Sequence, residues 1–152
     1  MKSIGNIQLL NTQKIAFLCS DKYSSKSVLA SYDWVSEIKK QKRCVISGFQ
    51  SRLEMDILDI LLQGTSPIVM VLARSIFVKC PAKYRAAVES GQMLIVSPFD
   101  DDIPIVTRER ARIRNLKVIE LADEIVVGHI NQGGMLEGIL LETEKGVVVL
   151  DK

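Results

Sequence analysis

Six short apolar runs, rich in β-branched residues, alternate along the chain with segments of helical period. They are continuously hydrophobic, as strands buried on both faces of a parallel sheet are. The alternation therefore predicts an α/β protein whose parallel strands are joined by helical crossovers. The six runs are KIAFLC (14–19), RCVIS (43–47), PIVMVLA (67–73), MLIVS (93–97), EIVVG (124–128) and GVVVL (146–150).

Helical periodicity is clearest between the second and third runs. Leu53, Ile57 and Leu61 recur at i, i+4 and i+8, and Ser51 with Glu54 forms an S-x-x-E capping box at the start of this helix. The pattern favours a Rossmann-like, doubly wound, mainly parallel sheet of five or six strands with helices on both faces. Further helices are expected near 82–91, 105–121 and 133–143.

Length and composition narrow the class of protein. The 152 residues suit one Rossmann-like domain over 1–152, and 47% hydrophobic with 25% charged residues excludes disorder as the main state. No apolar run could span a bilayer and no signal-peptide segment opens the chain, which predicts a cytoplasmic protein without membrane contact. The net charge of +2 does not by itself indicate nucleic-acid binding.

Catalytic and metal-binding patterns are not found. The three cysteines are widely spaced with no CxxC, and His129 is the only histidine, without a nucleophile or ligand at a suitable spacing. We therefore expect no metal site, no cofactor and no catalytic residue.

Ligands of open parallel sheets bind at the carboxyl ends of the strands, which directs attention to the strand-to-helix turns. The first turn, SDKYSSKS (20–27), lacks GxGxxG but offers hydroxyls and charge at Ser20, Lys22 and Ser24 for a phosphate. Taken alone, this segment is better explained by a plain N-cap with solvated lysines. In the second turn Gly48 permits close backbone approach, and Arg52 opposes the helix dipole.

The segment TRERARIRN (107–115) is the most concentrated positive patch in the chain. On a helix, Arg110 and Arg114 are expected to project away from the apolar stripe of Ile105, Ile113 and Leu116, and the other two arginines flank that stripe. A solvated basic face and a phosphate-binding face explain the row equally well.

Two glycines, Gly133 and Gly134, follow the fifth run and open a helix. Steric freedom at such a pair permits a tight turn. We also expect N–H groups of the pair to face a phosphate-sized anion at the helix start.

As an ordered set these turns resemble the Rossmann-like domain of the DNA-processing protein A family over about residues 4–145. The family's first turn resembles VGSRKxS, its second SGxARGID, its third RNRxIAGLSD and its last EAxxxSGSLxTA. The positions of this chain that match are Cys19, Ser20, Asp21, Lys22 and Ser24; Ser47, Gly48, Ser51, Arg52 and Glu54; Arg114 and Asn115 with Leu116, Leu121 and Asp123; and His129, Gly133, Gly134 and Leu136.

The resemblance implies a non-catalytic protein that binds single-stranded DNA through a basic pocket and helps to load a recombinase. Phosphates would pair with Lys22, Arg52, Arg112 and Arg114, and such binding should depend on salt. The related phosphoribohydrolase signature PGGxGTxxE is not matched, since Leu140 stands at the catalytic glutamate position.

Two further hypotheses stay open. One is a pocket for a nucleotide or a nucleotide-derived signal, which the low aromatic content of 5% favours because single-strand binders stack bases on aromatic rings. The other is a degenerate scaffold that acts through protein contacts, as a homodimer joined by an edge strand or an exposed helix. A ligand-free pocket in which Asp21 neutralises Arg52 or Lys22 would favour the scaffold.

Overall fold

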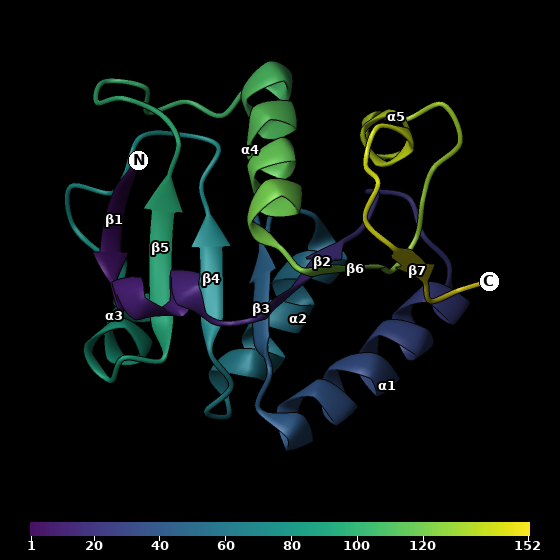
Figure 1. Cartoon of the computed structure of the whole chain (residues 1–152), viewed down its shortest axis with the longest axis horizontal. Helices are drawn as coiled ribbons and strands as arrows, with labels where there is room; N and C mark the ends of the chain where they lie inside the picture. Colours follow the sequence, from purple (N-terminus) through teal and green to yellow (C-terminus); the bar gives the residue numbers. More distant parts are fainter.

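A seven-stranded sheet organises the computed structural model, which describes all residues from 1 to 152 (Figure 1). The strand order is β1-β5-β4-β3-β2-β6-β7, with β1 antiparallel to β5 and every other pair parallel. The strands are β1 (Lys2–Gly5), β2 (Lys14–Leu18), β3 (Cys44–Ser47), β4 (Ile68–Val71), β5 (Met93–Ser97), β6 (Glu124–Val127) and β7 (Val147–Val149).

The six apolar runs of the sequence form β2 to β7, which confirms the predicted Rossmann-like class. The sheet has one strand more than expected, because the N-terminal segment adds β1 at the edge beside β5. Strand β1 is mostly exposed and carries no apolar run, so hydrophobic periodicity could not reveal it. At its end Gly5 has φ +106° and packs so closely on the Met93 carbonyl that a Cβ would overlap it.

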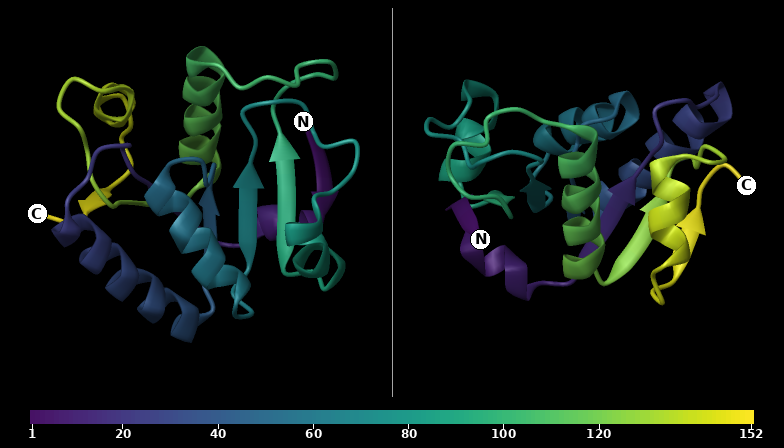
Figure 2. Two further views of the ribbon diagram at one scale, coloured as in Figure 1. Left: turned by 180° about the vertical axis from the view of Figure 1, so that it is seen from behind. Right: turned by 90° about the horizontal axis from the view of Figure 1, so that it is seen from above.

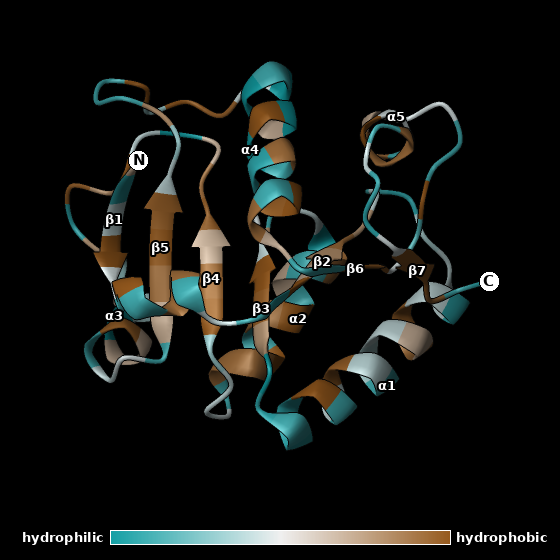
Figure 3. Ribbon diagram, viewed as in Figure 1, coloured by the Kyte–Doolittle hydropathy of each residue, from teal (hydrophilic) through white to brown (hydrophobic).

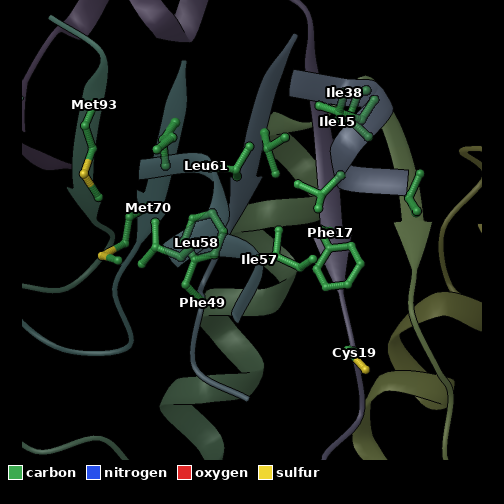
Figure 4. Packing of buried hydrophobic residues seen from close by; sticks show 14 of the residues in the cluster. Ile15, Phe17, Cys19, Ile38, Phe49, Ile57, Leu58, Leu61, Met70 and Met93 are labelled. Atoms are coloured by element: carbon green, nitrogen blue, oxygen red, sulfur yellow. The ribbon is translucent and has the colours of Figure 1, made fainter. Parts of the chain in front are cut away.

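Helices cover both faces of the sheet (Figure 2). Helices α1 to α3 share one apolar cluster with the sheet, including Phe17, Ile57 and Met70 (Figure 4). Helices α4 and α5 and a short 3-10 helix, η1, cover the other face through residues such as Val118 and Ile139. The bounds are η1 (Ile7–Asn11), α1 (Ser25–Gln41), α2 (Arg52–Leu62), α3 (Ala82–Glu89), α4 (Arg108–Leu121) and α5 (Met135–Leu141).

Helix α4 presents a different face to the sheet from the one that we expected. The predicted stripe is exposed at Ile105, which precedes the helix, and at Ile113. The buried face is instead Ala111, Arg114 and Val118, at i, i+3 and i+7, so the prediction that Arg114 points away from the core is wrong. Figure 3 shows the mixed hydropathy of this helix, which concealed the face from a search for apolar periodicity.

The winding of the sheet reverses at β2. Strand β3 lies on one side of β2 and β6 lies on the other. The connections that leave the carboxyl ends of β2 and β6 therefore diverge. Such a switch point is where doubly wound sheets bind ligands. No helix of the chain is both long enough and apolar enough to cross a membrane.

Candidate anion-binding site

A pocket of about 220 Å³ lies at this switch point. Its walls come from the ends of β2 and β6, the β3–α2 turn, the inner face of α4 and the start of α5. We call it the Arg114 pocket. It is lined by Cys19, Ser20, Asp21, Gln50, Ser51, Glu54, Arg108, Ala111, Arg114, Asn115, Asn131, Gly134, Met135 and Leu136.

Arg114 is the central cation of this pocket. Only 5% of the residue is exposed, and its Nε donates a hydrogen bond of 2.7 Å to Oδ1 of Asn115. No carboxylate lies within ion-pair distance of the guanidinium, and its two terminal nitrogens donate no hydrogen bond within the chain. Burial lowers the pKa of the guanidinium, and the nearby Glu54 carboxylate opposes that effect. A buried charge without a full set of partners is costly unless a ligand supplies them.

The turn after β3 is shaped around Arg114. Gly48 lies directly beneath the guanidinium, so that a Cβ at this position would overlap its atoms. The next residue, Phe49, has φ 50°, an uncommon left-handed conformation for a bulky side chain, and its N–H donates to Oγ of Ser47 at 3.0 Å. Strain of this kind persists where the surrounding structure fixes it, and it concentrates at functional sites.

Glu54 joins the two turns that flank the pocket. Its carboxylate accepts the N–H of Cys19 at 3.0 Å, that of Gln50 at 2.9 Å and that of Ser51 at 3.2 Å. Burial raises the pKa of this carboxyl, and the Arg114 charge and the three N–H donors oppose the rise only in part. The capping box that the sequence predicted is confirmed, and it serves also to tie β2 to the start of α2.

Asn131 fixes the opposite wall. Its backbone N–H donates to Oγ of Ser20 at 2.9 Å, and its side chain exchanges hydrogen bonds with the backbone of Lys22 at 2.6 and 3.2 Å. These bonds hold the β2–α1 and β6–α5 connections together across the switch point. Nothing in the sequence pattern marked Asn131, because its partner lies more than a hundred residues away.

Known structures share this arrangement of strands and helices. DNA processing protein A from Helicobacter pylori, described for its single-stranded DNA binding mode, matches with a TM-score of 0.77 at 18% identity over 97% of this chain and 69% of its own. The Streptococcus pneumoniae protein matches with a TM-score of 0.74 at 16% identity over 95% of this chain and 52% of its own. The chain has the fold of DNA processing protein A.

Other comparisons add a second fold relative. The molybdenum cofactor binding protein of Rippkaea orientalis matches with a TM-score of 0.59 at 13% identity, over 91% of this chain and 76% of its own. No protein-family model and no curated protein sequence matches the chain. The chain thus spans about two thirds of one DNA processing protein A and about half of the other.

Nine of the residues singled out by the resemblance to DNA processing protein A line the Arg114 pocket. They come from four separate segments, as expected for turns gathered at one edge of a parallel sheet. Gly48 contacts the pocket's arginine from beneath. The nine are Cys19, Ser20, Asp21, Ser51, Glu54, Arg114, Asn115, Gly134 and Leu136.

Other predicted residues lie outside the pocket. The Arg52 side chain is 78% exposed and pairs with Asp56 at 3.6 Å, while Lys22 is exposed. Ser24 caps α1, and Ser47 is buried in the turn described above. Arg112 lines an adjoining groove, where it pairs with Glu109 at 3.7 Å.

We expected the N–H groups of Gly133 and Gly134 to face an anion, as the last motif of DNA processing protein A implies. In the structure the two glycines have a different role. Gly133 has φ 74°, so the predicted turn is present. Its N–H donates to Oε1 of Glu137 at 3.0 Å, and that of Gly134 donates to the Asn131 carbonyl at 3.1 Å. Both N–H groups thus donate to acceptors within the chain. Gly134 lines the Arg114 pocket with its backbone alone.

A carboxylate of the chain itself lies beside the first turn of α1. Asp151 accepts hydrogen bonds from Nδ1 of His129 at 2.5 Å and from Oγ of Ser27 at 2.8 Å. Burial alone would raise the pKa of Asp151, but these two bonds outweigh it and hold the pKa below its ordinary value. No group of three or more His, Cys, Asp or Glu residues is placed to hold a metal ion.

Substitution of Gly48 by alanine tests the packing beneath Arg114. The backbone tolerates alanine, since Gly48 is not in the left-handed region, but the new Cβ would displace the guanidinium. We expect anion affinity to fall by at least about tenfold, equivalent to about 1.4 kcal/mol. Phosphate titration by calorimetry checks this, and unchanged affinity would show that the position of the guanidinium does not matter.

Proposed function

We propose that this protein binds a phosphate group of single-stranded DNA or of a nucleotide and acts without catalysing a reaction. One observation carries the proposal: the buried Arg114 guanidinium lines a pocket at the switch point with its terminal nitrogens unpaired. Arginine presents a planar set of donors that matches two phosphate oxygens at once. Because the Arg114 side chain is buried, this interaction is stronger than it would be in water.

The charges around the guanidinium support an anionic ligand. Arg108 adds a second cation at the rim. The Glu54 carboxylate is the nearest negative group, and its hydrogen bonds to three backbone N–H groups already engage both of its oxygens. Asp21 also lines the pocket, but it forms an ion pair with neither Arg52 nor Lys22, the pairing that would favour a scaffold role.

The side chains of the pocket support a binding role in preference to catalysis. The thiol of Cys19 is the strongest nucleophile at the pocket, but burial raises its pKa to about 12, which keeps it protonated at neutral pH. No histidine lines the pocket, and the Ser20 hydroxyl is engaged with the Asn131 N–H. An activated nucleophile with an adjacent base is therefore not assembled there.

The fold relatives support both ligand classes. DNA processing protein A from Helicobacter pylori binds single-stranded DNA, and the Rippkaea orientalis protein binds the molybdenum cofactor, a small molecule. The limited volume of the Arg114 pocket suits a phosphate group in either case. A recombinase partner stays a prediction from the family resemblance, and a homodimer stays a prediction of the scaffold hypothesis.

Binding of single-stranded DNA should weaken as salt is raised. Each phosphate contact contributes about −0.7 to the slope of log affinity against log salt concentration. Fluorescence anisotropy of a labelled single-stranded oligonucleotide at several salt concentrations measures this slope, with unlabelled dAMP as competitor. Absence of binding to the oligonucleotide, to dAMP and to inorganic phosphate would refute the proposed function.

A further inference from the structure

A second hollow of about 490 Å³ adjoins the Arg114 pocket between α4 and α5. The two hollows share Arg108, Gly134 and Met135, so they lie side by side. We call the second one the α4–α5 groove. Its other lining residues are Glu109, Arg112, Gly138, Ile139 and Glu142.

The volumes of the two hollows suit different parts of one ligand. Pockets that enclose small organic ligands are typically about 300–1,000 Å³. The Arg114 pocket, at about 220 Å³, is below this range and suits a phosphate with part of its sugar. The base of a nucleotide whose phosphate occupies this pocket would then extend past the shared residues into the α4–α5 groove.

The α5 side of the groove offers exposed glycine backbone beside an apolar side chain, Met135. Gly134 and Gly138 lie one turn apart, and a Cβ added at Gly138 would meet no atom within 4 Å. Met135, which is half-buried, flanks the exposed backbone, Ile139 beside it is buried in the core, and Figure 3 shows α5 as a predominantly hydrophobic helix. A planar ring can lie against such a surface, and a methionine thioether favours contact with aromatic rings.

The α4 side supplies a cation suited to stacking. Arg112 lines the groove, and its only ion-pair partner is Glu109 at 3.7 Å, a long contact on a solvent-exposed face. Guanidinium planes stack on aromatic rings, and arginine does so more readily than lysine. A ring bound against α5 would therefore be able to stack on the guanidinium plane of Arg112.

Beyond the groove, where arginines and glutamates are equal in number, the lining becomes acidic. The next hollow along α4 and α5 shares Ile139 and Glu142 with the groove and is also lined by Glu120 and Glu144. Lys145 is nearby, but its ammonium donates to three carbonyl oxygens at the end of α4. A phosphodiester chain continuing in this direction would meet carboxylates, whereas a neutral base would not. The space therefore fits one nucleotide, with its phosphate at Arg114.

We propose that the α4–α5 groove binds the base of a nucleotide whose phosphate occupies the Arg114 pocket. The inference rests on the proposed function and makes it more specific. The ligand is a nucleoside monophosphate or the phosphorylated end of a DNA strand, and these share the same chemistry at the site. Internal nucleotides of a strand are poorer ligands because their second phosphodiester would approach the carboxylates beyond the groove.

Leucine at position 138 tests the groove without disturbing the fold. Gly138 is exposed, its Cβ position is open, and leucine is a better helix former than glycine, so the variant should fold at least as well as the wild type. The matched control is Gly146→Leu, because Gly146 is also exposed with open space around it and lines none of the three hollows. Calorimetric titrations with dAMP and with inorganic phosphate measure the two parts of the site separately.

We expect Gly138→Leu to weaken dAMP binding about tenfold or more while phosphate affinity stays within about twofold. Gly146→Leu should change neither. If dAMP affinity is unaltered in Gly138→Leu while phosphate still binds, the base site is wrong and the phosphate site stands. If the wild type binds neither compound but binds the labelled oligonucleotide, the base site is wrong and the proposed function stands; if it binds none of the three, both proposals fail. A short 5′-phosphorylated oligonucleotide, compared with dAMP, distinguishes a strand end from a free nucleotide.

Discussion

Replacing Arg114 with methionine should abolish most of the affinity for phosphate-bearing ligands. Methionine fills the buried volume but removes the charge and the paired donors. Truncating one partner of a buried, hydrogen-bonded charge pair costs about 2–5 kcal/mol, so affinity should fall at least about 30-fold. Anisotropy with the labelled oligonucleotide and calorimetry with dAMP both measure this loss.

Arg52→Met is the matched control for this substitution. Arg52 also lies at the carboxyl edge of the sheet and carries the same charge, but its side chain is 78% exposed and does not line the Arg114 pocket. We expect its effect on affinity to be small and to vanish at high salt. An equal loss in the two variants would mean that general charge, and not the pocket, attracts the ligand.

Glu54→Gln should destabilise the folded protein by about 3 kcal/mol. The substitution turns one of two acceptor oxygens into a donor, which leaves an N–H of Cys19 or those of Gln50 and Ser51 without an acceptor. It also removes the negative charge nearest to the buried Arg114. For a domain of this length we expect the melting temperature to fall by roughly 6–12 °C, as measured by calorimetry or circular dichroism.

Glu37→Gln provides the comparison for Glu54→Gln. Glu37 lies on the exposed surface of α1, where it pairs only with Lys40 at 3.2 Å. Surface changes of this type alter stability by about 0.5 kcal/mol or less. If Glu54→Gln melted within a degree or two of Glu37→Gln, the three hydrogen bonds would not be tying the two turns together.

The sheet could be read from the sequence because its strands are apolar on both faces. Runs such as 67–73 and 93–97 have no polar alternation, and this pattern is specific to buried parallel strands. Strand β1 could not be predicted, because its four residues are mostly exposed and are held by pairing with β5. Its existence depends on a tertiary contact that leaves no periodic signal.

The site was only partly predictable. Arg114 was selected from the arginine row and from the family resemblance, yet its burial was missed because a charged residue occupies the inner face of α4. Glu54 was explained as a cap, although its second oxygen bonds to Cys19, thirty-five residues away. Asn131 carried no signal. Contacts between distant turns decide these roles, and helical or strand periodicity does not encode them.

The position of Asp151 has a consequence for how many ligands one molecule accepts. The start of the first crossover helix is the usual place for a phosphate in sheets of this class. Here a carboxylate already lies beside that turn, bonded to Ser27 and His129. A phosphate arriving there would be repelled, so Arg114 offers the single place for one. Saturation should therefore occur at one phosphoryl group per chain.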